Sequence, residues 1–245
     1  MNKFELFMVE IAYEVAKIPF VKKILSPIYY PIKKQFAIRQ NKIFKKNALD
    51  VIKDFNECCE INNINYTLAF GTLLGAIREK GFIKHDLDVD VAIWANDYSD
   101  KIQKKLERSG FKLVHSFEVD KGLLGREETY VKSGVSIDIF YFYEGDGVYP
   151  YCCDFIMHKG ATTFRSCMNR FGKVIPRRIE LPLTKERVQT DFEGTKLYVP
   201  KNAHEILVFR YGENYMIPDP DWHMELKNEH IMVWEGKSGI YKEYE

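Results

Sequence analysis

Two spacings of apolar residues alternate along the chain, and each predicts a different kind of element. Apolar residues at every third or fourth position indicate a helix with one buried side, whereas alternation with polar residues indicates a half-buried strand. The clearest alternation begins at Asp86 and leads into Trp94. In chain order the patterns predict a strand at 66–70, a helix at 72–79, a strand at 87–94, a helix at 98–109, strands at 111–116, 127–133 and 135–143, a hairpin turn at 144–147 into a strand at 148–156, and a helix at 202–211.

The first 46 residues differ in character from the rest of the chain. An apolar series at helical spacing runs from Phe4 to Ile18. The basic, aromatic stretch that follows is interrupted by three prolines, Pro19, Pro27 and Pro31. A second helix is expected from about residue 34 to residue 61. We therefore expect a basic amphipathic helical extension at 1–46 and a single domain at 47–245.

The order of the elements predicts an α+β fold, with a mixed β-sheet covered by helices and an N-terminal helical extension. The chain has 245 residues, of which 46% are hydrophobic, and this is enough to build a sizeable core. No internal repeat or low-complexity tract argues for a repeated architecture.

The acidic strand is the first candidate for chemistry. Asp86, Asp88 and Asp90 stand at alternate positions, so their side chains share one face of the strand. Carboxylates stacked in this way repel one another unless a cation neutralises them, and a ligand set made only of oxygen favours Mg²⁺ or Mn²⁺. The competing interpretation is a solvated acidic strand. The apolar partners Val89 and Val91 favour the metal site, because they make the strand at least half buried.

A phosphate-binding turn is expected just upstream. The apolar run at 66–70 meets Gly71 and Thr72, which open the predicted helix. Backbone N–H groups and the positive end of the helix dipole favour a phosphate at such a place. Metal-binding carboxylates beside a phosphate site indicate phosphoryl-transfer chemistry.

These residues resemble a known family. The segment GTLLGAIREKGFIKHDLDVDVAI, residues 71–93, is similar to the signature of the LicD/fukutin branch of the nucleotidyltransferase superfamily. In that signature Gly-Thr-Leu-Leu-Gly-x-x-Arg is followed by Pro-Trp-Asp-x-Asp-x-Asp. The resemblance covers about residues 50–222 in the same order, which is more specific than any single motif. Its further parts are Ser136–Phe140, Phe192-Glu193-Gly194, Val199-Pro200, Glu205-Ile206-Leu207 and Arg210–Pro218.

The resemblance implies a role for each matching residue. Asp88 and Asp90 fall on the metal-binding pair, with Asp86 beside them, and Asp138 falls on the third carboxylate of a neighbouring strand. Gly71 and Thr72 fall on the nucleotide-phosphate turn, and Arg78 matches an arginine that helps to hold phosphate. The chain departs from the family at Lys84-His85, where Pro-Trp is usual. His85 is therefore a candidate substrate-binding residue, and a structural or solvent-facing role is equally compatible with it.

Members of this family transfer a phospho-alcohol, such as phosphocholine or phosphoribitol, from a CDP-linked donor to a glycan hydroxyl. The resemblance thus implies a LicD-like catalytic domain at 47–245 that acts on a surface glycan or its lipid-linked precursor. Asp138 is a candidate catalytic base, and a role as metal ligand is equally compatible. Two other functions remain open, a nucleotidylyltransferase that attaches NMP to a small molecule and a non-catalytic, membrane-associated assembly protein.

Charge and cysteine content bear on partners and compartment. The formal net charge of +1 argues against general nucleic-acid binding. Five cysteines include two adjacent pairs and no Cys-x-x-Cys spacing, so reduced thiols are expected rather than a zinc site. Charged residues interrupt each long apolar stretch, and the start of the chain lacks the pattern of a signal peptide. We therefore expect a cytoplasmic protein that is at most peripheral on the inner face of the membrane.

The extension at 1–46 leads to a first prediction. It carries ten Lys and Arg residues against three Glu, a net charge of +7. Basic residues near an anionic bilayer contribute on the order of 1 kcal/mol each, and the apolar spacing suits a helix that lies in the interface. We expect the protein to co-sediment with anionic vesicles and not with neutral ones. Equal binding to both, or to neither, would favour the alternative that the segment packs on the protein or on a partner subunit.

Overall fold

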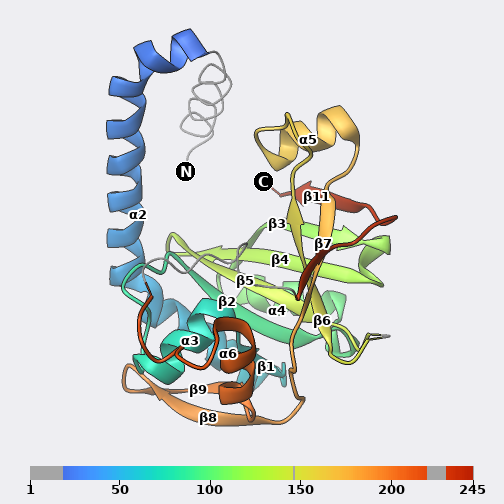
Figure 1. The fold of residues 1–245 in the computed structure, drawn as a ribbon. Coiled ribbons are helices and arrows are strands. Elements are labelled where there is room, and N and C mark those ends of the chain that lie inside the picture. Colours follow the sequence, from blue (N-terminus) through green and yellow to red (C-terminus); the bar gives the residue numbers. More distant parts are fainter. Residues whose placement is uncertain (1–18, 146, 220–229, 245) are drawn as a thin grey trace.

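The computed structural model describes residues 19–145, 147–219 and 230–244, and within them it shows the expected α+β fold (Figure 1). Its centre is a six-stranded sheet with the order β1-β2-β5-β4-β3-β11. Strands β2 and β5 are parallel and every other neighbouring pair is antiparallel, so the sheet is mixed as predicted. These strands are β1 (Tyr66–Leu68), β2 (Asp88–Trp94), β3 (Lys112–Val119), β4 (Gly125–Lys132), β5 (Val135–Phe142) and β11 (Gly239–Glu243).

Two helices cover one face of this sheet. The C-terminal part of α2 (Pro19–Ile61) packs on β2 and β5, and α4 (Asp100–Arg108) packs on β3. The branched residues of β2 and β5 that alternate with the aspartates are completely buried on this side, namely Val89, Val91, Ile137 and Ile139. Their burial fixes which face of each strand points outward, because a register shift of one residue would turn the aspartates into the core.

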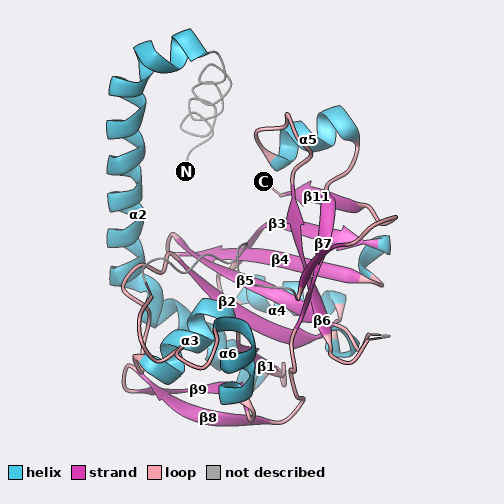
Figure 2. Ribbon diagram, in the orientation of Figure 1, coloured by secondary structure: helices cyan, strands magenta, loops and turns pink. Residues whose placement is uncertain are grey.

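The other face is covered only in part. Helices α3 (Phe70–Arg78) and α6 (Ala203–Tyr211) lie over one end of the sheet, with the hairpin β8–β9 (Arg187–Phe192 and Thr195–Pro200) below them (Figure 2). A second sheet, β10-β7-β6, packs over the other end through the stacked rings of Phe117 and Phe155. The remaining elements are η1 (Ala95–Asp97), η2 (Asp120–Gly122), β6 (Tyr151–Ile156), α5 (Phe164–Phe171), β7 (Ile175–Glu180) and β10 (Ile231–Val233).

Some element boundaries differ from the prediction. Helix α2 begins at Pro19, well before residue 34, and its first turns lie at an angle to the rest (Figure 1). The internal prolines, Pro27 and Pro31, lack the N–H that a helix needs, but the helix continues past them. The expected hairpin into β6 is reduced to one bridge between Tyr143 and Tyr151, after which β6 pairs with β7. The expected boundary between the extension and the domain, at 46/47, falls inside α2. The extension at 1–46 stays a prediction, and residues 1–18 lie outside the described part.

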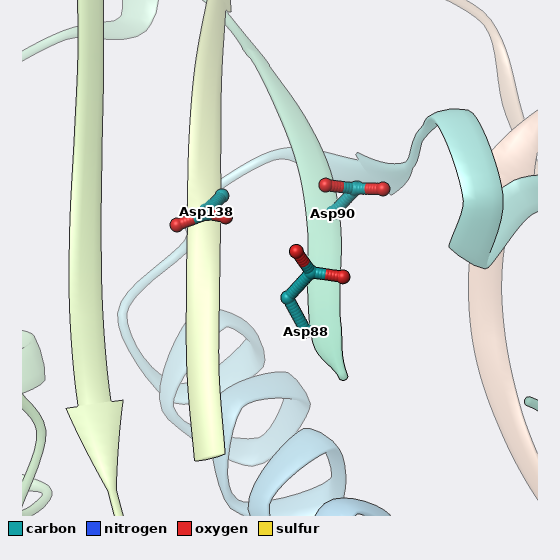
Figure 3. A group of neighbouring side chains, drawn as sticks. All are labelled: Asp88, Asp90 and Asp138. Atoms are coloured by element: carbon teal, nitrogen blue, oxygen red, sulfur yellow. The ribbon is translucent and has the colours of Figure 1, made fainter. Parts of the chain in front are cut away.

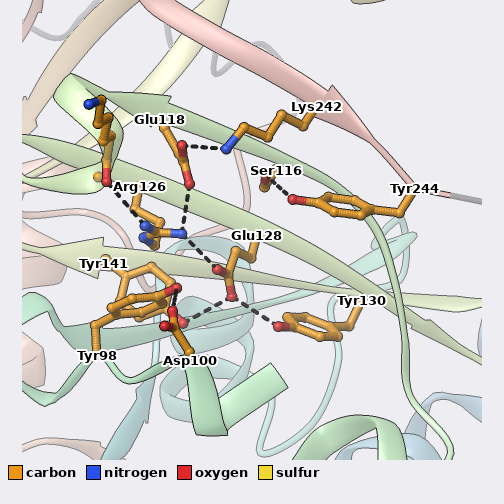
Figure 4. A network of polar contacts seen from close by, with 12 residues as sticks. Tyr98, Asp100, Ser116, Glu118, Arg126, Glu128, Tyr130, Tyr141, Lys242 and Tyr244 are labelled. Atoms are coloured by element: carbon orange, nitrogen blue, oxygen red, sulfur yellow. Dashed lines mark hydrogen bonds and ion pairs between the residues drawn. The ribbon is translucent and has the colours of Figure 1, made fainter. Parts of the chain in front are cut away.

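A buried polar network fixes the helix-covered side of β4 (Figure 4). Arg126 Nη1 lies 2.9 Å from Glu118 and 3.2 Å from Glu128. Glu128 also accepts hydrogen bonds from the hydroxyl groups of Tyr130 and Tyr141, at 3.0 and 3.1 Å. Since each buried carboxylate has several partners, the network avoids the cost of an uncompensated charge. It thereby holds the orientation of β4 between β3 and β5.

The described residues contain no helix that is long and apolar enough to cross a membrane. All five cysteines are free and buried, as expected for thiols without disulfide partners.

The end of α3 packs tightly against the loop that leads to the acidic strand. A Cβ atom at Gly75 would lie 2.4 Å from the carbonyl oxygen of Gly81, which is closer than real contacts allow. The same loop is fixed by Glu193 in the β8–β9 turn, whose N–H donates to Lys80 O and whose carboxylate accepts from the N–H of Phe82. Gly75 is therefore required by close approach of the backbone.

We predict that Gly75→Ala lowers the free energy of unfolding by about 1–3 kcal/mol, the usual cost of an overpacked contact. Gly71→Ala in the same helix is the matched control. Its Cβ would make ordinary contacts at 3.6 and 3.7 Å, so stability should be unchanged or higher by up to about 1 kcal/mol. Urea unfolding of both variants checks this, and equal effects of the two substitutions would contradict it.

Candidate active site

The structure brings three of the predicted aspartates together. Asp88 and Asp90 lie on β2, and Asp138 lies directly beside Asp90 on the parallel strand β5. Their side chains point to the same face of the sheet and toward one another (Figure 3). One carboxylate oxygen from each lies within 4.8 Å of those of the other two. This is the geometry in which one cation contacts all three groups.

Hydrogen bonds hold two of these carboxylates in place. The N–H of Gly71 donates to Asp90 Oδ2 at 3.3 Å, and the backbone N–H of Asp90 donates to the Thr72 hydroxyl at 2.9 Å. Thr129 on β4 donates its hydroxyl to Asp138 Oδ1 at 2.5 Å. The first turn of α3 is thus tied to β2 beside the acidic cluster. The phosphate-binding role of Gly71 and Thr72 stays a prediction.

The cluster carries uncompensated charge. Burial raises the pKa of each carboxyl group, to about 6 for Asp138, and raises it well above the usual range for Asp90, where the charges of Asp88, Asp138 and Asp86 add to the effect. Within the described residues, no Lys or Arg forms an ion pair with Asp88, Asp90 or Asp138. A divalent cation would supply the missing positive charge, and an all-carboxylate set suits Mg²⁺ or Mn²⁺. The residues present therefore fit a metal ion.

Asp86, Arg78 and His85 lie around this centre. Asp86 accepts a hydrogen bond from the N–H of Ile83 at 3.0 Å, and burial raises its pKa to about 6, with the charge of Arg78 opposing the shift. Arg78 itself is bound to Glu79 at 2.8 Å and to the carbonyl oxygen of Tyr215 at 3.3 Å. His85 is exposed in the turn before β2. The phosphate and substrate roles of Arg78 and His85 stay predictions.

Sequence reasoning missed several residues at this face of the sheet. Thr129 and Glu127 stand two apart on β4, and the register of β4 with β5 places them opposite Asp138 and Phe140. Burial raises the pKa of the Glu127 carboxyl well above its usual range, and the charges of Asp138, Asp154 and Asp90 raise it further. The alternation of β4 was visible in the sequence, but only the register with β5 shows which of its residues face the aspartates.

Helix α6 also contributes to the site. Burial raises the pKa of the Tyr211 hydroxyl; Arg210 opposes this shift, and the charges of the nearby Asp90 and Asp86 add to it. The guanidinium of Arg210 lies 4.5 Å from the ring centroid of Phe70 and packs α6 on α3. The sequence motif around these residues resembles the family, and the structure shows that it lies against the same centre.

Comparisons with known proteins agree with this geometry. The model of the LicD/FKTN/FKRP nucleotidyltransferase domain matches residues 63–202. The chain is similar to ribitol-5-phosphate transferase FKTN of Mus musculus, with 27% identity over 182 residues, 74% of this chain and 35% of the mouse protein. It is also similar to lipopolysaccharide cholinephosphotransferase LicD of Haemophilus influenzae, with 42% identity over 65 residues, 26% of this chain and 23% of that protein.

The chain spans only about a third of the length of the mouse relative, since 35% of that protein is matched. The family model nevertheless covers more than half of the chain, including β2 with its aspartates and β5 with Asp138. The chain therefore belongs to the LicD/FKTN/FKRP family of nucleotidyltransferase domains.

Proposed function

We propose that this protein is a metal-dependent transferase that moves a phospho-alcohol group from a CDP-linked donor to a hydroxyl of a glycan or of its lipid-linked precursor. The observation that carries the proposal is the convergence of Asp88, Asp90 and Asp138 without a basic partner among the described residues. Such a centre suits the transfer of a phosphoryl group. The names of the two relatives, a ribitol-5-phosphate transferase and a cholinephosphotransferase, support a phospho-alcohol as the group transferred.

Each residue of the site would have a separate role in such a reaction. Asp88, Asp90 and Asp138 would hold the metal, and Thr129 keeps Asp138 oriented through its hydroxyl. Bound Mg²⁺ or Mn²⁺ would neutralise the donor diphosphate and lower the pKa of the acceptor hydroxyl. The N-terminal turn of α3, at Gly71 and Thr72, would present the positive end of its helix dipole to the donor phosphates, while the N–H of Gly71 is donated to Asp90. Attack in line at the phosphorus that bears the alcohol then expels CMP.

The acceptor bears on where the protein works. A lipid-linked glycan would lie at a membrane surface, and the basic segment 1–46 would then bring the site close to it. This segment is only partly described, and we propose peripheral docking on the cytoplasmic face on the basis of its charge.

The function is tested by product analysis. The protein is incubated with Mg²⁺, a panel of CDP-alcohols that includes CDP-ribitol and CDP-choline, and free oligosaccharides as acceptors. We expect Mg²⁺-dependent release of CMP together with a glycan that gains the mass of the phospho-alcohol. Release of pyrophosphate from a nucleoside triphosphate, with no CMP from any CDP-alcohol, would indicate a nucleotidylyltransferase instead. No product and no metal binding would indicate a non-catalytic protein.

The metal site leads to a prediction on stability. A metal bound only by the folded state at a hundredfold excess over Kd adds about 2.7 kcal/mol, or a melting shift of about 5–10 °C for a chain of this size. We expect Mg²⁺ with a CDP-alcohol to raise the melting temperature of the wild type by that amount, and Asp90→Asn to lose most of the shift. Transfer by Asp90→Asn or Asp88→Asn should fall more than tenfold, which is about 1.4 kcal/mol in the barrier.

In EDTA the order of stabilities should reverse. Burial and repulsion raise the carboxyl pKa values in the folded state, to about 6 for Asp86 and Asp138. A raised pKa costs stability as the pH rises from about 4 to about 6, because the unfolded carboxyl groups ionise first. Asp90→Asn should therefore melt at or above the wild type in EDTA at pH 7, and the difference should vanish below about pH 4. A wild type that does not respond to metal and donor together would contradict the metal site.

A further inference from the structure

Glu127 is a carboxylate on the active-site face that the metal centre does not use. Its strand, β4, lies next to β5, and Glu127 pairs with Phe140, one step along the same face from the pair formed by Thr129 and Asp138. A diagonal neighbour of this kind lies about 7–8 Å away at the backbone, within reach of a long side chain. Because Glu127 and Asp138 share this face at diagonal positions of neighbouring strands, the charges of Asp138 and Asp90 act on the Glu127 carboxyl.

The Glu127 carboxyl group has no bonding partner in the part of the chain that the structure describes. No described residue donates a hydrogen bond to it or forms an ion pair with it. The residue as a whole is half-buried. The neighbouring carboxylate of Asp154, in contrast, has a bonding partner. Arg177 donates two hydrogen bonds to it, one of them at 3.0 Å.

Asp138, in contrast, is already engaged. One of its oxygens receives the Thr129 hydroxyl at 2.5 Å, and its carboxylate is part of the set whose oxygens converge within 4.8 Å. A carboxylate that binds a cation and accepts a hydrogen bond is a poor proton acceptor, because both contacts stabilise its charged form. The transfer reaction still requires a place for the proton of the attacking hydroxyl.

We propose that Glu127 accepts the proton of the acceptor hydroxyl, while Asp138 serves as a metal ligand; this inference rests on the proposed function. As the acceptor O–H bond breaks, its proton passes to a carboxylate oxygen of Glu127. The hydroxyl oxygen forms the new bond to phosphorus, and the bond from phosphorus to CMP breaks, so that CMP leaves with the electron pair. The acceptor then lies between β4 and the metal centre, on the side of the site that faces β6.

Glu127→Gln tests this role, because an amide has nearly the same shape and cannot take up the proton. In the CMP-release assay with oligosaccharide acceptors, we expect kcat to fall by about 10²–10⁴-fold, the usual contribution of a positioned base. The KM for the CDP-alcohol and the melting shift with Mg²⁺ and donor should stay close to those of the wild type. The melting temperature in EDTA should be equal or higher, since the substitution removes a repelling carboxylate and no hydrogen bond within the described residues.

Glu128→Gln is the matched control, because Glu128 is the next residue on the same strand and points to the opposite face. Its carboxylate is bound to Arg126, Tyr130 and Tyr141, so the amide should lower the melting temperature. Well below that temperature kcat should stay within about threefold of the wild type. The two variants therefore have opposite signatures, one in rate and the other in stability.

The outcomes separate the inference from the proposed function. If the wild type releases no CMP from any donor, the proposed function fails and the inference fails with it. If the wild type is active and Glu127→Gln keeps more than a tenth of its kcat, or loses the melting shift with metal, only the inference is overturned. If Glu127→Gln folds poorly, Glu127→Asp is the second variant, because it keeps the charge on a shorter side chain. We expect it to fold and its kcat to fall by about 10–100-fold. An unchanged kcat would also reject the role of Glu127.

Discussion

The parallel pairing of β2 with β5 sets Asp90 beside Asp138 and places three carboxylates on one patch of the sheet. Electrostatic repulsion alone would disperse them. The opposite faces of the same two strands carry completely buried branched residues, such as Val89 and Ile137, on the side where α2 packs. A shift in register would expose those residues and bury the aspartates, and both changes are costly. Hydrophobic burial on one face therefore maintains an unfavourable charge cluster on the other.

Segments far apart in the sequence support this patch. Helix α3 is tied to β2 through the hydrogen bonds of Gly71 and Thr72 with Asp90. The loop after α3 is held by Glu193 in the β8–β9 turn, and Arg78 at the end of α3 reaches the carbonyl oxygen of Tyr215. The segments whose sequences resemble the family therefore contact one another in the fold. Together these contacts hold α3 and the loop that leads into the acidic strand.

Strand β4 has two faces with different functions. One face carries Arg126 and Glu128, whose ion pairs and hydrogen bonds hold the strand in the sheet. The other carries Thr129, which orients Asp138, and Glu127, which has no bonding partner among the described residues. Because the strand is held rigidly through one face, a reactive group on its other face stays at a fixed distance from the metal centre. Proton transfer by a positioned side chain requires such a fixed distance.

The sequence by itself determined the acidic strand, the small-residue start of α3 and the α+β class, because local periodicity and turn chemistry decide these features. It also indicated Asp138 through the resemblance to a family. Only the tertiary structure decided that β5 lies parallel to β2 and that β4 lies beside β5, and so brought Thr129 and Glu127 to the site. Strand order and register depend on contacts between residues far apart in the chain, and a single sequence carries no local signal for them. Likewise, the local pattern of prolines predicted an interruption of helical structure, whereas the folded chain continues α2 through Pro27 and Pro31.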